Sequence, residues 1–222
     1  MIPLRDTQRS YSTPFVTVFI IVINVLIFLY QVSLDPYSGN HFIAIYGIIP
    51  ESFRPSTVIT SMFLHGGWLH LIGNMWFLWI FGDNVEDILG HLKYLLFYLL
   101  CGIAAAVMHL VVNADSRLPV IGASGAIAGV MGAYLVKFPH SRIHTLVFVF
   151  IFMTTVEIPA AFMLLYWFVI QIFSGIGSIG YSSASKGGTA WFAHVGGFVA
   201  GMVLVYLMGA QQRFKNRRDL SW

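Results

Sequence analysis

A serine flanked by small residues is the first group in this sequence that could do chemistry. Ser124 stands in the run Gly122-Ala123-Ser124-Gly125, near the start of an apolar segment. Small residues commonly let membrane helices approach closely, so helix packing is the more frequent role of such a run. The alternative is a nucleophile, which needs a base within hydrogen-bond reach and donors for a developing oxyanion. A nucleophile therefore requires partners at the same depth elsewhere in the chain.

The composition is that of an integral membrane protein. Of the 222 residues, 58% are hydrophobic and only 9% are charged, whereas soluble domains carry about 25% charged residues. Cys101 is the single cysteine, which excludes an internal disulfide. The formal charge of +3 is modest, and we expect a lipid bilayer around the chain and no nucleic-acid partner. The length suits one membrane domain over residues 1–222.

Six apolar runs predict an all-α membrane protein with six transmembrane helices. A helix needs about 20 apolar residues to cross a bilayer. The predicted helices cover approximately residues 15–32, 66–81, 92–112, 120–136, 160–174 and 191–208.

The connections between these runs differ in character. Residues 82–90 are polar and predict a loop, and residues 143–159 predict an interfacial lead-in to the fifth helix. Nine glycines and serines between Gly175 and Ala190 predict a flexible loop. A basic tail, 211–222, follows the sixth helix.

Six crossings put both termini on one side, and the basic residues indicate which side. Cytoplasmic loops of membrane proteins carry an excess of lysine and arginine. Nine basic residues fall on the side of the termini and three on the other, which predicts cytoplasmic termini. The nine are Arg5, Arg9, Lys93, Lys137, Arg142, Arg213, Lys215, Arg217 and Arg218, and the three are Arg54, Arg117 and Lys186.

Polar residues open the three helices that run inward from the outer side. His70 and Asn74 open the second, Ser124 the fourth and His194 the sixth. With a rise of 1.5 Å per residue, all four would lie roughly 5–10 Å below the outer edge. Polar side chains at membrane depth are costly and usually functional. Their convergence at one depth therefore indicates a site.

The residue types suggest a role for each group. Ser124 would be the nucleophile, and His194 the base that takes its proton and later returns it to the leaving amine. His70 and Asn74 are spaced i, i+4, so both can donate from one helix face to an oxyanion. The backbone N–H of Ser124, near a helix N-terminus, is a further donor. None of the nine acidic residues lies near these helix openings, which predicts a Ser–His dyad.

Each residue also has a structural interpretation. His194 could be a core histidine bonded across helices, and Asn74 could join two helices. His65 and His70 could bind a metal with another histidine, but no cysteine or carboxylate joins them at ligand spacing. We therefore expect no metal.

Two glycine pairs favour packing over chemistry. Gly125 and Gly129 lie in the fourth predicted helix, and Gly197 and Gly201 in the sixth. Small residues at this spacing let helices approach closely. They would bring Ser124 within reach of the histidine.

Taken together, these motifs resemble the rhomboid family of intramembrane serine proteases, in its basic six-helix bacterial form. The resemblance covers about Phe15 to Met208. It rests on His70-x-x-x-Asn74, Gly122-Ala123-Ser124-Gly125 and Ala193-His194-x-x-Gly197-x-x-x-Gly201, with Gly82-Asp83-Asn84-Val85-Glu86-Asp87-x-x-Gly90 as a structural match.

The resemblance implies an endopeptidase that cleaves single-pass membrane proteins near their outer end, without metal, nucleotide or other cofactor. It implies Ser124 and His194 as the catalytic pair. We expect a multi-pass protein of the plasma membrane. Its oligomeric state stays open.

Two departures from the family pattern stand out. The long first loop usually carries Trp-Arg and here has Phe53-Arg54. Some members place an aromatic residue one turn after the serine to stack on the histidine, and here that position is Ala128. Trp191 or Phe192 would then orient the histidine.

The resemblance also implies a route for substrate past the fifth helix and the loop over the site. Residues 175–190 would form the cap. Contacts of bulky residues of the fifth helix with the second, for example with Trp76 or Trp79, would close the lateral opening; these residues are Phe162, Leu165, Phe168 and Phe173.

Two other functions fit parts of the sequence. A catalytically silent rhomboid-like protein would bind membrane clients without cutting them, but such proteins typically lack the serine or the histidine. A small transporter would use intramembrane polar residues and should show inverted repeats. No such repeat is visible.

Overall fold

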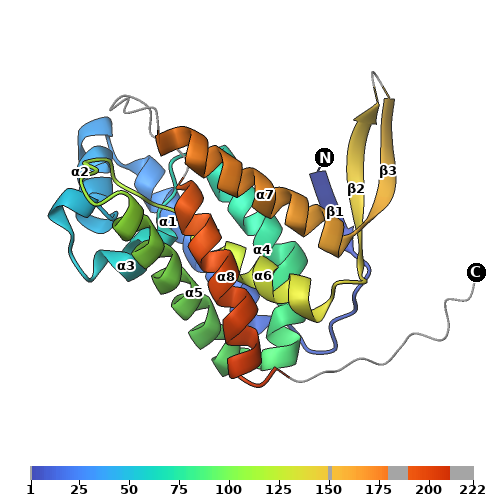
Figure 1. Ribbon diagram of the computed structural model, residues 1–222. Helices are drawn as coiled ribbons and strands as arrows, with labels where there is room; N and C mark the ends of the chain where they lie inside the picture. The colour runs from blue at the N-terminus through green and yellow to red at the C-terminus, as the bar shows by residue number, and fades with distance from the viewer. Residues whose placement is uncertain (1, 150–151, 180–189, 211–222) are drawn as a thin grey trace, which may run out of the picture.

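The computed structural model describes residues 2–149, 152–179 and 190–210, which form a helical bundle with a small sheet at one end (Figure 1). The elements in chain order are β1 (Ile2–Asp6), α1 (Phe15–Ser33), α2 (Pro36–Tyr46), η1 (Pro50–Ser52), α3 (Thr57–Thr60), η2 (Ser61–Phe63), α4 (Trp68–Leu89), α5 (His91–Val112), α6 (Ser124–Lys137), β2 (Arg142–Val149), β3 (Phe152–Pro159), α7 (Ala160–Ile179) and α8 (Trp191–Leu207).

Each of the six predicted apolar runs contains a helix: α1, α4, α5, α6, α7 and α8. Three stretches in the described part of the chain are long and apolar enough to cross a membrane: Phe15–Ser33, His91–Val112 and Ala160–Gly177. Two further apolar helices, α6 and α8, are shorter. The protein is thus a mostly helical membrane protein.

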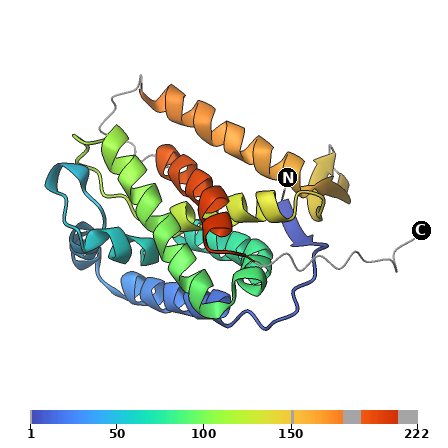
Figure 2. The same ribbon diagram turned by 60° about the horizontal axis from the view of Figure 1, so that its bottom comes forward.

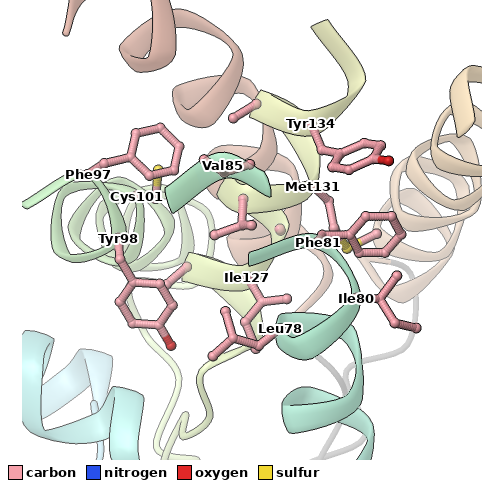
Figure 3. Close-up of a cluster of buried hydrophobic side chains, with 14 of the residues drawn as sticks. Leu78, Ile80, Phe81, Val85, Phe97, Tyr98, Cys101, Ile127, Met131 and Tyr134 are labelled. Carbon is pink, nitrogen blue, oxygen red and sulfur yellow. The ribbon is translucent and has the colours of Figure 1, made fainter. Parts of the chain in front are cut away.

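Helix α6 lies inside the bundle, between α4, α5 and α8 (Figure 2). It was predicted to begin near residue 120 but begins at Ser124. Gly122 has a positive φ of 122°, which is not a helical conformation, so the helix can begin only after it. The core around α6 is made of fully or almost fully buried side chains from three helices (Figure 3). They include Leu78, Phe81 and Val85 of α4, Phe97, Tyr98 and Cys101 of α5, and Ile127, Met131 and Tyr134 of α6.

The glycine pairs of α6 and α8 allow backbone contact, as predicted. A Cβ atom on Gly197 would collide with the carbonyl oxygen of Gly125, and one on Gly201 with the carbonyl oxygen of Gly129. Side chains larger than a hydrogen atom would force the two helices apart. The predicted packing role of these motifs is confirmed.

The predicted polar loop over residues 82–90 is wrong, because α4 continues to Leu89 and ends at Gly90, whose φ is 77°. Glu86 is fully buried and accepts hydrogen bonds from the N–H groups of Val16 and Thr17 at 2.9 and 2.8 Å. The first N–H groups of a helix have no acceptor within it, and a carboxylate also favours the positive end of the helix dipole. The acidic run therefore caps α1.

Residues 143–159, predicted as an interfacial lead-in to the fifth helix of an all-α protein, form strands instead. β2 and β3 form an antiparallel hairpin, and β1 pairs with β2 to complete a three-stranded sheet in the order β1-β2-β3. The segment is rich in valine, isoleucine, threonine and phenylalanine, which favour strands. The fold is therefore not purely α-helical. Strand β3 forms an exposed edge, with Phe152 and Met153 solvent-accessible.

The long connection after α1 contains a helix that the sequence analysis did not predict. Asp35 caps the start of α2 by accepting hydrogen bonds from two backbone N–H groups at 3.0 and 3.2 Å. Arg54 donates to the carbonyl oxygens of Ala44 and Ile45 near the other end of α2, at 2.7 and 2.6 Å. The Phe53-Arg54 pair thus keeps an arginine that fixes this connection.

The glycine- and serine-rich loop begins later than predicted, since α7 extends to Ile179. Its remaining predicted part, 180–189, lies outside the described residues, as does the basic tail 211–222.

Replacing Glu86 by alanine should destabilise the protein, because two N–H groups of α1 would lose their acceptor in a buried place. We expect a loss of about 2 kcal/mol or more, seen as a lower midpoint of thermal unfolding in detergent. Glu157→Ala is the matched control, because Glu157 is half exposed and forms only ion pairs of 3.6 and 3.7 Å. Its effect should stay within about 0.5 kcal/mol. Equal effects of the two variants would contradict the capping role.

Gly197→Ala should push α6 and α8 apart and lower the thermal midpoint, with a cost of about 1–3 kcal/mol for overpacking. Gly73→Ala is the control, since a Cβ atom there would meet no atom within 4 Å. That variant should unfold at the temperature of the parent protein or slightly above it. An unchanged midpoint for Gly197→Ala would show that the helices are not held at backbone contact.

Candidate active site

Ser124 and His194 lie side by side, although 70 residues separate them in the sequence. Ser124 is the first residue of α6, and His194 lies in the first turn of α8. The Oγ atom of Ser124 is 2.7 Å from Nε2 of His194. The backbone contact between Gly125 and Gly197 lies beside this pair and sets the distance between the two helices.

The second ring nitrogen of His194 meets an amide that the sequence analysis missed. Nδ1 is 2.7 Å from Oε1 of Gln171, a buried residue of α7. An amide oxygen can only accept a hydrogen bond, so Nδ1 carries the ring proton. Nε2 is then left unprotonated and accepts the hydrogen bond from Ser124. The available signal was a lone amide inside an apolar helix.

Two tryptophans border the imidazole ring of His194. The ring of Trp167, from α7, is tilted by 36° with its centroid 5.7 Å away. Trp191 meets the imidazole edge-on at 6.4 Å. The predicted contact with Trp191 thus exists, but the hydrogen bond that fixes the ring comes from α7. Trp167 lies where it can cover the histidine in place of an aromatic residue at position 128.

His70 and Asn74 converge on the turn before Ser124. Nδ1 of His70 accepts a hydrogen bond from the N–H of Gly66 at 3.2 Å, which leaves Nε2 as the protonated donor. A Cβ atom on Gly122 would lie 2.7 Å from that Nε2 and 3.7 Å from Nδ2 of Asn74. The positive φ of Gly122 and this close approach both require glycine.

The amide nitrogen of Asn74 is buried and has no hydrogen-bond partner among the described residues. A buried donor without an acceptor is costly unless something else binds it. The nitrogen lies beside a cavity of about 550 Å³ that is also lined by His70, Gly122, Ser124 and His194. The arrangement therefore presents a nucleophile, a base and free donors to one space.

His65 does not join this group of residues. It is buried, and its ring lies 5.1 Å from that of His70, at a steep angle. Its backbone is held by the side chain of Gln31 through two hydrogen bonds of 3.1 and 3.2 Å. Across the described ranges, no three histidine, cysteine or acidic side chains gather closely enough to hold a metal ion.

The predicted contact of Phe168 with the second helix is wrong. Phe168 stacks on Phe198 of α8, with ring centroids 4.5 Å apart. Trp76 and Trp79 of α4 are about half exposed, and the indole of Trp76 donates to the carbonyl oxygen of Pro3 at 2.6 Å. Hence this face of α7 packs on α8, the helix that carries His194.

Comparison with known proteins gives a consistent result. The Rhomboid domain family matches residues 52–211. Rhomboid protein 1, mitochondrial, of Saccharomyces cerevisiae is 30% identical over 80% of this chain and 49% of its own length. RHOMBOID-like protein 6, mitochondrial, of Arabidopsis thaliana is 30% identical over 74% of this chain and 48% of its own length.

A human relative, Presenilin-associated rhomboid-like protein, mitochondrial, is 32% identical over 63% of this chain and 36% of its own length. The chain thus spans about half the length, or less, of these relatives. The family match covers more than half of the chain and includes Ser124, His194, His70, Asn74 and Gln171. This chain belongs to the rhomboid family.

Proposed function

We propose that this protein is an intramembrane serine endopeptidase that cleaves transmembrane segments of single-pass proteins near the outer membrane face. The observation that carries the proposal is the 2.7 Å contact between Oγ of Ser124 and Nε2 of His194. The hydrogen bond at Nδ1 keeps Nε2 free to accept a proton. Family membership makes peptide hydrolysis the expected use of this pair.

The residues support acyl transfer in two stages. Ser124 attacks the scissile carbonyl as its proton moves to Nε2 of His194. The resulting oxyanion would be bound by Nε2–H of His70, Nδ2–H of Asn74 and the backbone N–H of Ser124. The imidazolium then protonates the leaving amine as the C–N bond breaks. Water, deprotonated by the same histidine, hydrolyses the acyl-enzyme and restores Ser124.

Membrane segments are the proposed substrates because the site lies between lipid-facing helices. The outward face of α7 carries exposed apolar side chains such as Phe162 and Phe173. The cavity at Ser124 and His194 is also lined by Trp167 of α7, and a peptide in the membrane would reach it past such a lipid-facing helix. The chemistry needs no metal, nucleotide or other cofactor, and we propose none.

We further propose a single membrane domain over residues 1–222 with six crossings and both termini cytoplasmic. Two lysines, Lys93 and Lys137, lie at the same end of the bundle, beside the C-terminal end of α8. The ammonium of Lys93 donates to the carbonyl oxygen of Met208 at 3.2 Å, and that of Lys137 lies 4.1 Å from the ring centre of Tyr206. Such clustering supports the positive-inside orientation.

This orientation suits the plasma membrane, which is the proposed location. Several relatives carry mitochondrial or chloroplastic in their names, and an organellar membrane is the competing location.

Fusing a reporter that is active only in the cytoplasm to each terminus tests the orientation. Both fusions should be active, and a split result would exclude an even number of crossings.

Ser124→Ala and His194→Ala should each abolish cleavage of a transmembrane substrate reconstituted in vesicles. A fluorophosphonate should label the parent protein at Ser124 and label neither variant. The double variant should be no worse than either single one, because members of a catalytic unit are not additive. Unlabelled but folded parent protein would instead favour a rhomboid-like protein that binds clients without cutting them.

Asn74→Ala and His70→Ala should slow turnover by about 10²–10³-fold each, the usual effect of losing one oxyanion donor. Because the nucleophile and base remain, slow fluorophosphonate labelling should persist in both variants. His65→Ala is the control for a nearby buried histidine, and its main effect should be on thermal stability. Complete loss of labelling in all three variants would assign these residues to the fold.

A further inference from the structure

The contact between α7 and α8 is a seam of three side-chain layers. Phe168 stacks on Phe198 below the site, with centroids 4.5 Å apart. Gln171 meets His194 in the middle layer. Above them Gly175 faces Phe192, whose Cζ would lie 3.1 Å from a Cβ atom on that glycine. The α7 positions follow at intervals of three and four residues, which is the spacing of one helix face.

We propose that Gln171 is a positioning residue that fixes both the tautomer and the orientation of His194, an inference that rests on the proposed function. The hydrogen bond joins two almost fully buried side chains, with 5% of Gln171 and 7% of His194 exposed. In such surroundings a lost hydrogen bond is not replaced by bulk water.

The chemistry of the two groups makes the bond directional. Oε1 of Gln171 can only accept, so it selects the tautomer with the proton on Nδ1. The opposite tautomer would place a proton on Nε2, which would then donate to Oγ of Ser124 instead of accepting from it. A serine in that arrangement could not transfer its proton to the ring. Gln171 therefore decides whether His194 is a base.

A neutral partner also suits the location. An aspartate in this position would be an ionised group in an apolar helix, and charges at membrane depth are costly. The amide satisfies Nδ1–H without a net charge. It also explains how the dyad operates although none of the described acidic side chains contacts His194. Gln171 orients His194 as the third residue of a catalytic triad would. Unlike a carboxylate, it provides no negative charge beside the imidazolium.

Gln171→Leu should test the proposal, since leucine fills a similar volume and accepts no hydrogen bond. Fluorophosphonate labelling at Ser124 should slow by about 10–100-fold, the effect expected for a hydrogen bond to a group that becomes charged. Ser174→Ala, one turn along α7, is the matched control and should label at the parent rate. Thermal unfolding of both variants in detergent checks that the bundle is intact.

The variant Gln171→Glu should change the pH dependence of labelling, which a merely structural role of Gln171 would leave unchanged. A carboxylate accepts from Nδ1–H as the amide does, so labelling should be retained. Its charge also favours the protonated imidazole, which cannot accept the serine proton. The acid limb of the pH–labelling profile should therefore move to higher pH by about one unit or more. A profile identical to that of the parent would overturn the proposal.

Histidine-selective ¹⁵N NMR separates this proposal from the proposed function. The signals of His194, assigned with the His194→Ala variant, should show a proton on Nδ1 in the parent protein. They should lose that preference in Gln171→Leu. An unchanged tautomer in Gln171→Leu would refute the positioning role even if the protein is a protease. A changed tautomer in a protein that never labels at Ser124 would retain the positioning role and reject the protease.

Discussion

The backbone contact between α6 and α8 is the interaction on which the candidate site depends. Carbonyl oxygens of Gly125 and Gly129 occupy the space that side chains would take at Gly197 and Gly201. Only at this separation can Ser124, on one helix, reach His194 on the other at 2.7 Å. Lipid offers no hydrophobic drive for helix association, so close packing has to supply the attraction. The same glycines that hold the bundle together therefore set the distance between Ser124 and His194.

Two buried polar side chains of α4, Glu86 and Asn74, differ in their hydrogen bonding. Glu86 is fully buried and receives hydrogen bonds from Val16 and Thr17, so its charge joins α4 to α1. Asn74 is buried in the same helix, yet its amide nitrogen has no partner among the described residues. Pairing is the usual state of buried polar atoms. Glu86 thus has a structural role at one end of α4, whereas the free amide nitrogen of Asn74 at the other end is available for the proposed oxyanion.

The sequence alone was sufficient to identify the candidate site residues whose polar side chains lie in apolar helices. Ser124, His194, His70 and Asn74 stand out because polar groups are rare in apolar helices, and the structure brings them together. Hydrophobicity alone could not identify the β2–β3 hairpin, because an apolar run fits a buried strand as well as a helix. The helical end of α4 was missed for the opposite reason. Its acidic residues resembled a solvated loop, although Glu86 serves the start of a helix about 70 residues earlier.

Gln171 could not be assigned from sequence, since a lone amide in α7 gives no indication of which helix it faces. The position of Gln171 links two roles of α7: movement for substrate entry in the proposed protease, and contact with α8. In the proposed protease, α7 would have to be displaceable to admit a membrane substrate, and its outward residues Phe162, Tyr166 and Phe173 are already exposed. The same helix supplies the acceptor for His194 and the stacking partner of Phe198. A displacement that broke the α7–α8 seam would also release the base. If the protein is the proposed protease, substrate would therefore enter by a movement that leaves α7 packed on α8 at Gln171.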